Sequence, residues 1–379
     1  MSLQARTLGA LAEVAAADWD ALHDGRNPFL RHAFLEGLER HGCLRPEWGW
    51  TARHLTLWDG TRLVAAAPGY LKTNSHGEFV FDHAWAHAYA RHGLDYYPKW
   101  LFAVPYSPVP GPRLLARDGA ARRALLAAIA HQADADGLAS AHVNFHTGAE
   151  DALFGEDWLP RIDVQYHWRN RDGWRDFAGF LAAMDHRHRK NIRQERAKVQ
   201  RAGVVFRRLH GDEASPAELD AIHRFYLQTF RDYGNAPALT RDFIGHIARE
   251  IPRNILIILA YHEAIPVAGA LCLRGADTLY GRYWGADTHL PGLHFETCYY
   301  QGIEYCLEQG LARFEPGAQG EHKLARGFLP ALVRSRHRIA DPQFRQALRD
   351  WCAEEARSVR RYAATLDAHG PFRDPARAG

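Results

Sequence analysis

The chain has 379 residues, which is enough for two domains of ordinary size. Apolar residues make up 47% of the sequence and charged residues 24%, a composition that excludes an intrinsically disordered chain. The net charge of +3 is too small to indicate nucleic-acid binding by the whole surface, so any such site must come from local clustering. The five cysteines form no CxxC pair, which argues against a disulfide framework and a zinc ribbon.

The apolar segments are short. The longest uninterrupted run, residues 255–261, is far below the roughly 20 residues that a membrane-spanning helix needs. Acidic residues interrupt the apolar stretch near the N-terminus, so the pattern of a signal peptide is missing. We therefore expect a cytoplasmic protein without an integral membrane segment, in which any membrane contact is peripheral.

The first half of the sequence predicts a β-hairpin followed by a helix. Asp59 and Gly60 separate the apolar runs 54–58 and 62–72, which is a strong hairpin signal. An aromatic-rich strand region is expected at 78–85 (EFVFDHAW). The pattern then predicts a helix over 120–136, with Gly137 at the position of a left-handed C-cap, and a strand directly after it.

The second half repeats this order. A hairpin over 255–274 leads to an aromatic strand at 279–286, a helix over 295–309 that ends at Gly310, and a new strand. The repeated order indicates a duplication into two related α/β halves. The other predicted helices are a short one at 177–182, a basic one at 186–201 and a C-terminal amphipathic one at 342–366.

The basic helix carries seven Lys and Arg residues against a single acid, Glu195. One interpretation is a surface that holds a polyanion, such as a tRNA backbone, a nucleotide phosphate or an anionic membrane. The residues predicted to bind it are Arg189, Lys190 and Arg193. The alternative is a solvated helix whose charges are paired elsewhere in the fold.

A polar, glycine-rich segment follows the last predicted strand of the second half (315–328, EPGAQGEHKLARGF). Gly317 and Gly320 would let the backbone approach a ligand closely. His322 or Glu321 could act as a general base, and Lys323 could hold a phosphate or carboxylate. These three are the predicted catalytic residues. The alternative is a strand-to-helix turn whose polar side chains only cap and solvate.

Polar and aromatic side chains elsewhere are predicted to bind substrate. They lie beside the glycine-rich segment, at the start of the 295–309 helix, or near the first-half aromatic region. The predicted substrate-binding residues are Tyr283, His294, Glu296, Glu315, Gln319, Arg326, Tyr97, Lys99 and Asp82. The sequence lacks HEXXH, and the segment before residue 295 lacks the glycine spacing of a P-loop or dinucleotide fingerprint. We therefore expect neither a metal site nor ATP or dinucleotide chemistry.

Several long segments resemble the FemAB-like family of the GNAT acyltransferase superfamily. They are 293–330 (LHFETCYYQGIEYCLEQGLARFEPGAQGEHKLARGFLP), 187–204 (RHRKNIRQERAKVQRAGV), 76–89 (HGEFVFDHAWAHAY), 96–100 (YYPKW) and 105–115 (PYSPVPGPRLL). The resemblance implies an α/β (α+β) fold of two tandem GNAT-like domains, each a mixed sheet flanked by helices. The domains expected are 1–165 and 166–340, with the basic helix 186–201 in the second, followed by a C-terminal helix and tail at 341–379.

This resemblance implies an N-acyltransferase that acts on an amine acceptor, with a cell-envelope precursor as one candidate. Fem ligases take the acyl group from aminoacyl-tRNA, whereas other GNAT enzymes use acyl-CoA. The chain lacks both the usual GNAT pyrophosphate loop and the coiled-coil hairpin of some Fem ligases, so aminoacyl-tRNA, acyl-CoA and acyl carrier protein remain alternative co-substrates. No tightly bound cofactor is expected. Two other functions remain open: long-chain acyl transfer to a lipid or small-molecule amine, and non-catalytic binding of cell wall or polyanions.

Overall fold

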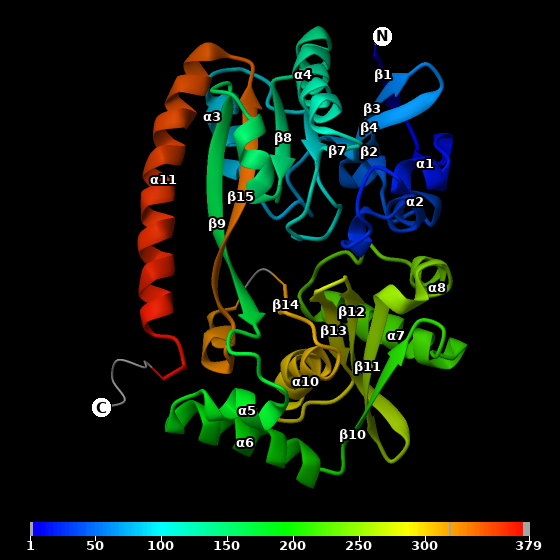
Figure 1. Cartoon of the computed structure of the whole chain (residues 1–379), viewed down its shortest axis with the longest axis vertical. Helices are drawn as coiled ribbons and strands as arrows, with labels where there is room; N and C mark the ends of the chain where they lie inside the picture. The colour runs from blue at the N-terminus through cyan, green and yellow to red at the C-terminus, as the bar shows by residue number, and fades with distance from the viewer. Residues whose placement is uncertain (1–2, 318–319, 374–379) are drawn as a thin grey trace. The chain divides into compact units, whose positions relative to one another are not determined.

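The computed structural model describes residues 3–317 and 320–373 (Figure 1). The chain forms two compact units. Unit 1 is the chain up to Val164 together with Leu332–Arg361, and unit 2 is Gln165–Ala331 together with the chain from Tyr362 onwards. The first boundary lies within one residue of the one expected at 165, whereas the second differs from the one expected at 340 because segment 332–361 belongs to unit 1.

Unit 1 contains two sheets. Their strands are β1 (Gln4–Leu8), β2 (Trp50–Ala52), β3 (His54–Asp59), β4 (Arg62–Ala67), β5 (Gly69–Lys72), β6 (Lys99–Phe102), β7 (Leu115–Ala116), β8 (Ser140–Asn144) and β15 (Leu329–Ile339). The smaller sheet is antiparallel in the order β1-β3-β4-β7. The larger one has the order β2-β5-β6-β8-β15, in which β6 and β8 are parallel and the other pairs antiparallel.

The hairpin predicted around Asp59 and Gly60 is confirmed, since β3 and β4 pair from Leu55 to Asp59. The single strand expected over 62–72 is wrong, because the chain leaves the smaller sheet at Pro68 and enters the larger one as β5. Proline has no N–H group to donate to a sheet. A side chain at Gly69 would lie 2.4 Å from the carbonyl oxygen of Arg53, so the crossing requires glycine.

The helices of unit 1 are α1 (Ala16–Asp20), α2 (His32–Arg40), α3 (His83–Arg91), α4 (Gly119–Ala135) and most of α11 (Pro342–Ala368). On α4, Leu125 and Ile129 join a buried core with Leu55, Trp100 and Val143. The predicted C-cap is confirmed, since Gly137 has a φ of 64°. The strand expected at 78–85 is wrong: residues 78–82 form a loop and α3 begins at His83. The charged side chains of this loop turn inward to an ion pair, which a strand at this position would not permit.

Unit 2 is built on a sheet in the order β10-β11-β12-β13-β14-β9. Its strands are β9 (Trp158–Arg169), β10 (Val205–His210), β11 (Ile255–His262), β12 (Ile265–Arg274), β13 (Thr278–Ala286) and β14 (Arg313–Glu315); the part of β9 up to Val164 belongs to unit 1. Neighbouring strands are antiparallel except for β13 and β14, which are parallel. The hairpin predicted at 255–274 and the aromatic strand predicted at 279–286 are therefore both confirmed as β11, β12 and β13.

The helices of unit 2 are α5 (Phe177–Ala182), α6 (His186–Arg201), α7 (Pro216–Asp232), α8 (Arg241–Glu250), α9 (Leu293–Phe295) and α10 (Gln301–Glu308). A π-helical turn, Glu296–Tyr300, joins α9 to α10, so the helix expected at 295–309 starts earlier and is not regular. Gly302 lets this helix approach β14, where a Cβ atom would lie 2.4 Å from the ring of Phe314.

Both units contain one pair of parallel neighbouring strands with a longer helix between them along the chain. In unit 1 this is β6, α4 and β8, and in unit 2 it is β13, α10 and β14. The other strand pairs described within each unit are antiparallel, so each unit contains one mixed sheet with helices packed against it. The predicted α/β fold class, with a mixed sheet flanked by helices in each half, is confirmed. No helix within residues 3–317 and 320–373 is long and apolar enough to cross a membrane.

Candidate functional site

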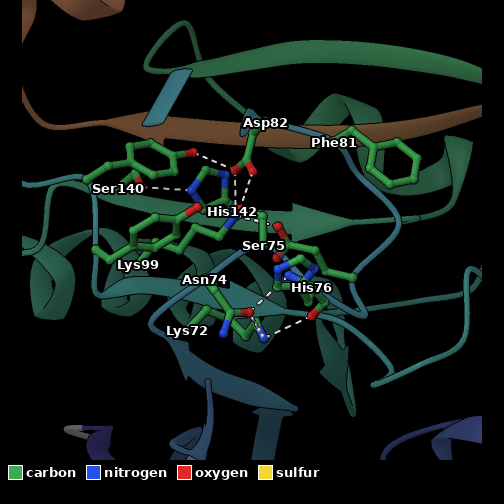
Figure 2. A network of polar contacts seen from close by, with 12 residues as sticks. Lys72, Asn74, Ser75, His76, Phe81, Asp82, Lys99, Ser140 and His142 are labelled. Carbon is green, nitrogen blue, oxygen red and sulfur yellow. Dashed lines mark hydrogen bonds and ion pairs between the residues drawn. The ribbon is translucent and has the colours of Figure 1, made fainter. Parts of the chain in front are cut away.

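Unit 1 holds a buried ion pair network beneath the loop between β5 and α3 (Figure 2). The ammonium group of Lys99 forms ion pairs with both Glu78 and Asp82, and it lies 3.0 Å from the hydroxyl of Ser75. The three charged side chains are only 1–2% exposed. A buried ammonium group is tolerated because two carboxylates surround it.

Tyrosine hydroxyls complete the network. Tyr96 donates to Asp82 at 2.6 Å, and Tyr97 lies 2.7 Å from Ser75, which itself bonds to Asp82. Burial alone would raise the pKa of Asp82, but Lys99 outweighs it and holds that pKa well below its usual range. Burial raises the pKa of Glu78 to about 7 despite Lys99. Asp82 is therefore the carboxylate that stays ionised against Lys99.

Lys72 is a second fully buried ammonium group in this region. It donates to the carbonyl of His76 at 3.0 Å and lies 3.8 Å from the ring centroid of Trp50. Burial lowers the pKa of Lys72 to about 7, and the nearby charge of Glu78 only partly opposes this. Lys72 therefore loses its proton more readily than an ordinary lysine.

Two buried histidines from distant segments meet beside the network. His142 on β8 and His337 on β15 have their Nδ1 atoms 2.6 Å apart, and each Nε2 atom contacts a serine hydroxyl, Ser140 or Ser335. Burial lowers the pKa of His142 to about 3 and that of His337 well below its usual value. Both rings are neutral, so one Nδ1 donates and the other accepts.

The network fixes the backbone of the loop above it. Glu78 and Asp82, the two partners of Lys99, stand immediately before and after residues 79–81. Phe79 has a φ of 59°, a strained conformation for a bulky residue, which persists only where the surroundings hold it. This cluster is closed to solvent, so its evident role is to position the loop.

In unit 2, the parallel strands β13 and β14 separate at the segment predicted to carry the chemistry. Their pairing covers three residue pairs and ends at Tyr280 and Glu315, while β13 continues to Ala286. Arg282 lies at the point of separation and donates to the carbonyls of Gly281 and Glu315 at 2.8 and 3.2 Å. The side chain of Arg282 thus bonds to both strands where their pairing ends.

Glu315 and Lys323 have shifted pKa values at this point. Burial raises the pKa of the Glu315 carboxyl to about 7, although Arg282 and Arg313 oppose the shift. Burial lowers the pKa of Lys323 to about 8, and Arg282 adds to the effect. The Lys323 ammonium group donates to the carbonyl of Gly317 at 2.9 Å. A lysine with this pKa can release a proton near neutral pH.

His322 lies at the start of the 3₁₀ turn Glu321–Arg326, with its side chain accessible to solvent. Its Nε2 atom is 2.8 Å from the hydroxyl of Tyr299, and its ring lies beside that of His294. Burial of part of the ring lowers the pKa of His322, and the charges of Lys323 and Arg326 lower it further. Burial lowers the pKa of His294 to about 4. Both imidazoles are therefore neutral at pH 7.

Arg326 connects this turn to the basic helix. Its guanidinium stacks on the ring of Phe295, donates to the carbonyl of His322 at 2.7 Å and binds Glu195 of α6 at 2.6 Å. Glu195 also accepts a short hydrogen bond from the hydroxyl of Tyr300 in the π-helical turn. The single acid of α6 thus holds both the His322 turn and the π-helical turn.

The structure brings some of the predicted site residues together and separates others. In unit 1, Asp82, Tyr97 and Lys99 share one network. In unit 2, His294, His322 and Arg326 form one cluster, and Glu315 and Lys323 lie at the strand separation.

Other predicted residues have different surroundings. Tyr283 packs edge-on against Tyr226, and Glu296 forms an ion pair with Arg196. Glu321 accepts a short bond from Tyr362. Gln319 lies outside the described residues.

Sequence reasoning missed Tyr299, His142 and His337 as site residues. Tyr299 resembled one more helical core aromatic, and the two histidines are 195 residues apart. No local pattern could have paired them.

The basic helix α6 presents one exposed cationic face. Lys190 and Arg193 are exposed, and Arg189 is partly buried with a 3.4 Å contact to the carbonyl of Met184. These three line a shallow hollow along the helix together with His186, Gln194, Ala197 and Arg201. Arg196 points to the other side and binds Glu296 and Glu304.

Comparison with known proteins gives the family. Residues 10–374 match the FemAB-like family, described as peptidoglycan biosynthesis/recognition. The chain belongs to the FemAB-like family. The predicted enzyme class, an acyltransferase, is thereby confirmed. No curated protein sequence matches this FemAB-like chain significantly.

Solved structures share its fold at low sequence identity. The C-terminal domain (DUF2156) of a protein from Agrobacterium fabrum is 10% identical, with a TM-score of 0.54 and coverage of 89% of this chain and 96% of that one. FemX is 12% identical, with a TM-score of 0.52 and coverage of 91% and 100%. L-PGS from Bacillus licheniformis is 10% identical, with a TM-score of 0.51 and coverage of 80% and 86%. At these identities the likeness concerns the fold.

Proposed function

We propose that this FemAB-like protein is an N-acyltransferase that moves an acyl or aminoacyl group from a phosphate-bearing carrier to an amine, with a cell-envelope precursor as acceptor. The transfer site is the cluster of His294, Tyr299, His322, Lys323 and Arg326 in unit 2. The observation that carries this proposal is a neutral, solvent-accessible imidazole, His322, hydrogen-bonded to a buried tyrosine hydroxyl.

The geometry suits general-base catalysis. When the Nε2–H group of His322 donates to the Tyr299 hydroxyl, the lone pair on Nδ1 is free to accept a proton. Burial raises the pKa of Tyr299, so the phenol stays neutral. The acceptor amine attacks the acyl carbonyl, a C–N bond forms, and the bond from the carbonyl carbon to the oxygen or sulfur of the carrier breaks. Nδ1 takes the amine proton and returns it to the leaving group.

Cationic side chains supply the other requirements of the reaction. We assign to Lys323 the role of stabilising the negative charge that develops on the carbonyl oxygen. Arg326 holds the turn that carries His322, through its bonds to that residue's carbonyl and to Glu195. Glu321 is the weaker candidate for the base, because it is already bonded to Tyr362.

The exposed face of α6 favours aminoacyl-tRNA as the donor. Arg189, Lys190 and Arg193 form a basic surface in the same unit as His322, and a nucleic-acid backbone binds such surfaces through its phosphates. Acyl-CoA and acyl carrier protein remain the alternative donors, since each also carries phosphate. The same face supports the second candidate function, in which the protein binds a polyanion without catalysis.

Replacing His322 tests the proposal. In a transfer assay with aminoacyl-tRNA, and separately with acyl-CoA, His322→Ala is expected to lower kcat by about 10² to 10⁴ because the base is removed. The control is His262→Ala, which removes an exposed histidine at the end of β11. Full activity of His322→Ala with either donor would show that the base lies elsewhere. Donor binding without transfer to any amine would favour the non-catalytic function.

A further inference from the structure

Unit 1 contains a small pocket that is separate from the residues assigned to transfer. Its volume is about 230 Å³. It is lined by Phe79, Val80, Phe81, Phe145, Arg161, Ile162, Asp163, Val333, Arg334, Ser335, Glu355 and Val359. Drug-sized ligands occupy pockets of about 300–1,000 Å³. This pocket therefore fits a side chain or a molecule of similar size.

The wall of this pocket is mostly aromatic and aliphatic, and it is held in place. Phe79–Phe81 is the segment whose flanking carboxylates both bind Lys99, and Figure 2 shows the Phe81 ring directed away from that network. Phe81 is 51% exposed, which is unusual for so large an apolar group. Phe79 and Phe145 both have positive φ angles, 59° and 56°, so two strained residues shape one pocket.

Some charged side chains at the pocket form ion pairs and others do not. Arg161 makes a two-point ion pair with Glu355 at 2.7 and 2.8 Å, and Arg334 binds Asp151, which it shares with Arg336. Among the residues that the structure describes, Asp163 has no ion-pair partner; its carboxylate accepts a hydrogen bond from the adjacent backbone N–H of Val164. A carboxylate beside aromatic rings is the arrangement that attracts an organic cation.

We infer that this pocket binds a primary ammonium group on an apolar stem, with Asp163 as the counter-ion and Phe81 as the wall. The pKa of Asp163 is raised because the surrounding protein removes water from its carboxyl group, and a bound ammonium group would offset this cost. The inference goes beyond the proposed function, because it assigns unit 1 a ligand site that uses none of the transfer residues of unit 2.

Binding to the full chain without any donor tests the inference. The probe is 2-phenylethylamine, titrated by ligand-observed NMR, with 2-phenylethanol and 3-phenylpropionate as neutral and anionic probes of similar size. We expect the amine to bind at least about tenfold more tightly than either, because only the amine forms a charge-assisted hydrogen bond with Asp163. Asp163→Asn should remove that preference, whereas Asp95→Asn, at an exposed aspartate elsewhere in unit 1, should keep it.

A second variant distinguishes the contribution of the Phe81 ring to binding from that of the Asp163 charge. Phe81→Ala removes an exposed ring and should weaken binding of the amine and the alcohol alike. Equal binding of amine and alcohol to the unaltered protein, tighter binding of the propionate, or an unchanged amine preference in Asp163→Asn would each overturn the inference. Loss of transfer in His322→Ala with amine binding retained would support both proposals, and amine binding in a protein without transferase activity would contradict only the proposed function.

Discussion

Buried charges in the two units are stabilised to different degrees, and this difference is visible residue by residue. Lys99 is surrounded by two carboxylates and the hydroxyl of Ser75, so its removal would leave Glu78 and Asp82 buried without a cation. Breaking a buried pair in this way costs about 3–5 kcal/mol. Within the described part of the chain, the Oε2 atom of Glu315 is buried and has no hydrogen-bond partner. Burial therefore disfavours the charged form of Glu315, as its raised pKa indicates.

Glu315 should make the stability of the protein depend on pH in a defined window. Its pKa is about 7 in the folded state against 4.5 as the ordinary value, so between these values the folded state binds more protons than the unfolded state. Stability contributed by the protonated form is complete below pH 4.5 and is lost as the pH rises through 7. Glu315→Gln should remove this loss, which is on the order of 3 kcal/mol.

Chemical denaturation at pH 4.5, 6 and 8 measures this effect as the difference between variant and unaltered protein. Glu250→Gln, at an exposed glutamate at the end of α8, serves as the control and should show no pH-dependent difference. A Glu315→Gln variant whose stability follows that of the unaltered protein at all three pH values would contradict a folded-state pKa near 7.

Among the elements, α6 combines two roles on opposite faces. One face presents Arg189, Lys190 and Arg193 to solvent, while Glu195 on the other binds Arg326 and Tyr300. A polyanion on the outer face would thus bind to the same helix that positions the His322 turn. This arrangement gives the lone acid of a basic helix a clear purpose, which the sequence pattern left open.

Substitutions on the outer face of α6 test whether this face binds tRNA. Changing Arg189, Lys190 and Arg193 together to Gln should weaken tRNA binding and lower the slope of log K against log salt by about 3, because three phosphate contacts are removed. Three exposed arginines of α11, Arg349, Arg357 and Arg360, form the matched control. An unchanged slope in the α6 variant, or an equal change in the α11 variant, would exclude α6 as the binding face.

The success of sequence reasoning also varies with the element. Periodicity and turn residues placed α5, α6 and α4 and the β11–β12 hairpin within one or two residues, because local interactions determine them. The loop at 78–82 was expected to be a strand, because its aromatic residues favour β structure. In the structure, this segment is a loop because Glu78 and Asp82 bind Lys99. These two residues lie 21 and 17 positions before Lys99 in the sequence. The π-helical turn had no local signal either.

For the candidate site, the sequence predicted residue types better than their contacts. His322, Lys323 and Arg326 were recognised because titratable side chains follow a glycine-rich segment. Tyr299 could not be chosen, since its pairing with His322 depends on how the 3₁₀ turn packs on the π-helical turn. Two of the three acids predicted there, Glu296 and Glu321, have other partners in the structure.

At the scale of the whole molecule, the two units are not two consecutive halves of the chain. The chain leaves unit 1 after Val164 and returns to it at Leu332, and this returning segment, 332–361, supplies most of β15 and α11. β15 pairs with β8 from Ser335 to Ile339, and Phe344, Leu348 and Cys352 of α11 contribute to a core that includes Trp85. Unit 1 thus needs two separate parts of the chain.

Residues 1–164 alone are therefore expected not to fold cooperatively. Without 332–361, β8 would become an unpaired edge, His142 would lose His337, and the apolar faces of Trp85 and Tyr89 would be exposed. Joining 332–361 to residue 164 through a flexible glycine–serine linker should restore a single cooperative transition in chemical denaturation, because both parts of the sheet and core are then present. A linker of the same length followed by a scrambled 332–361 segment is the control. Cooperative unfolding of 1–164 alone would show that the returning segment covers a unit that is already complete.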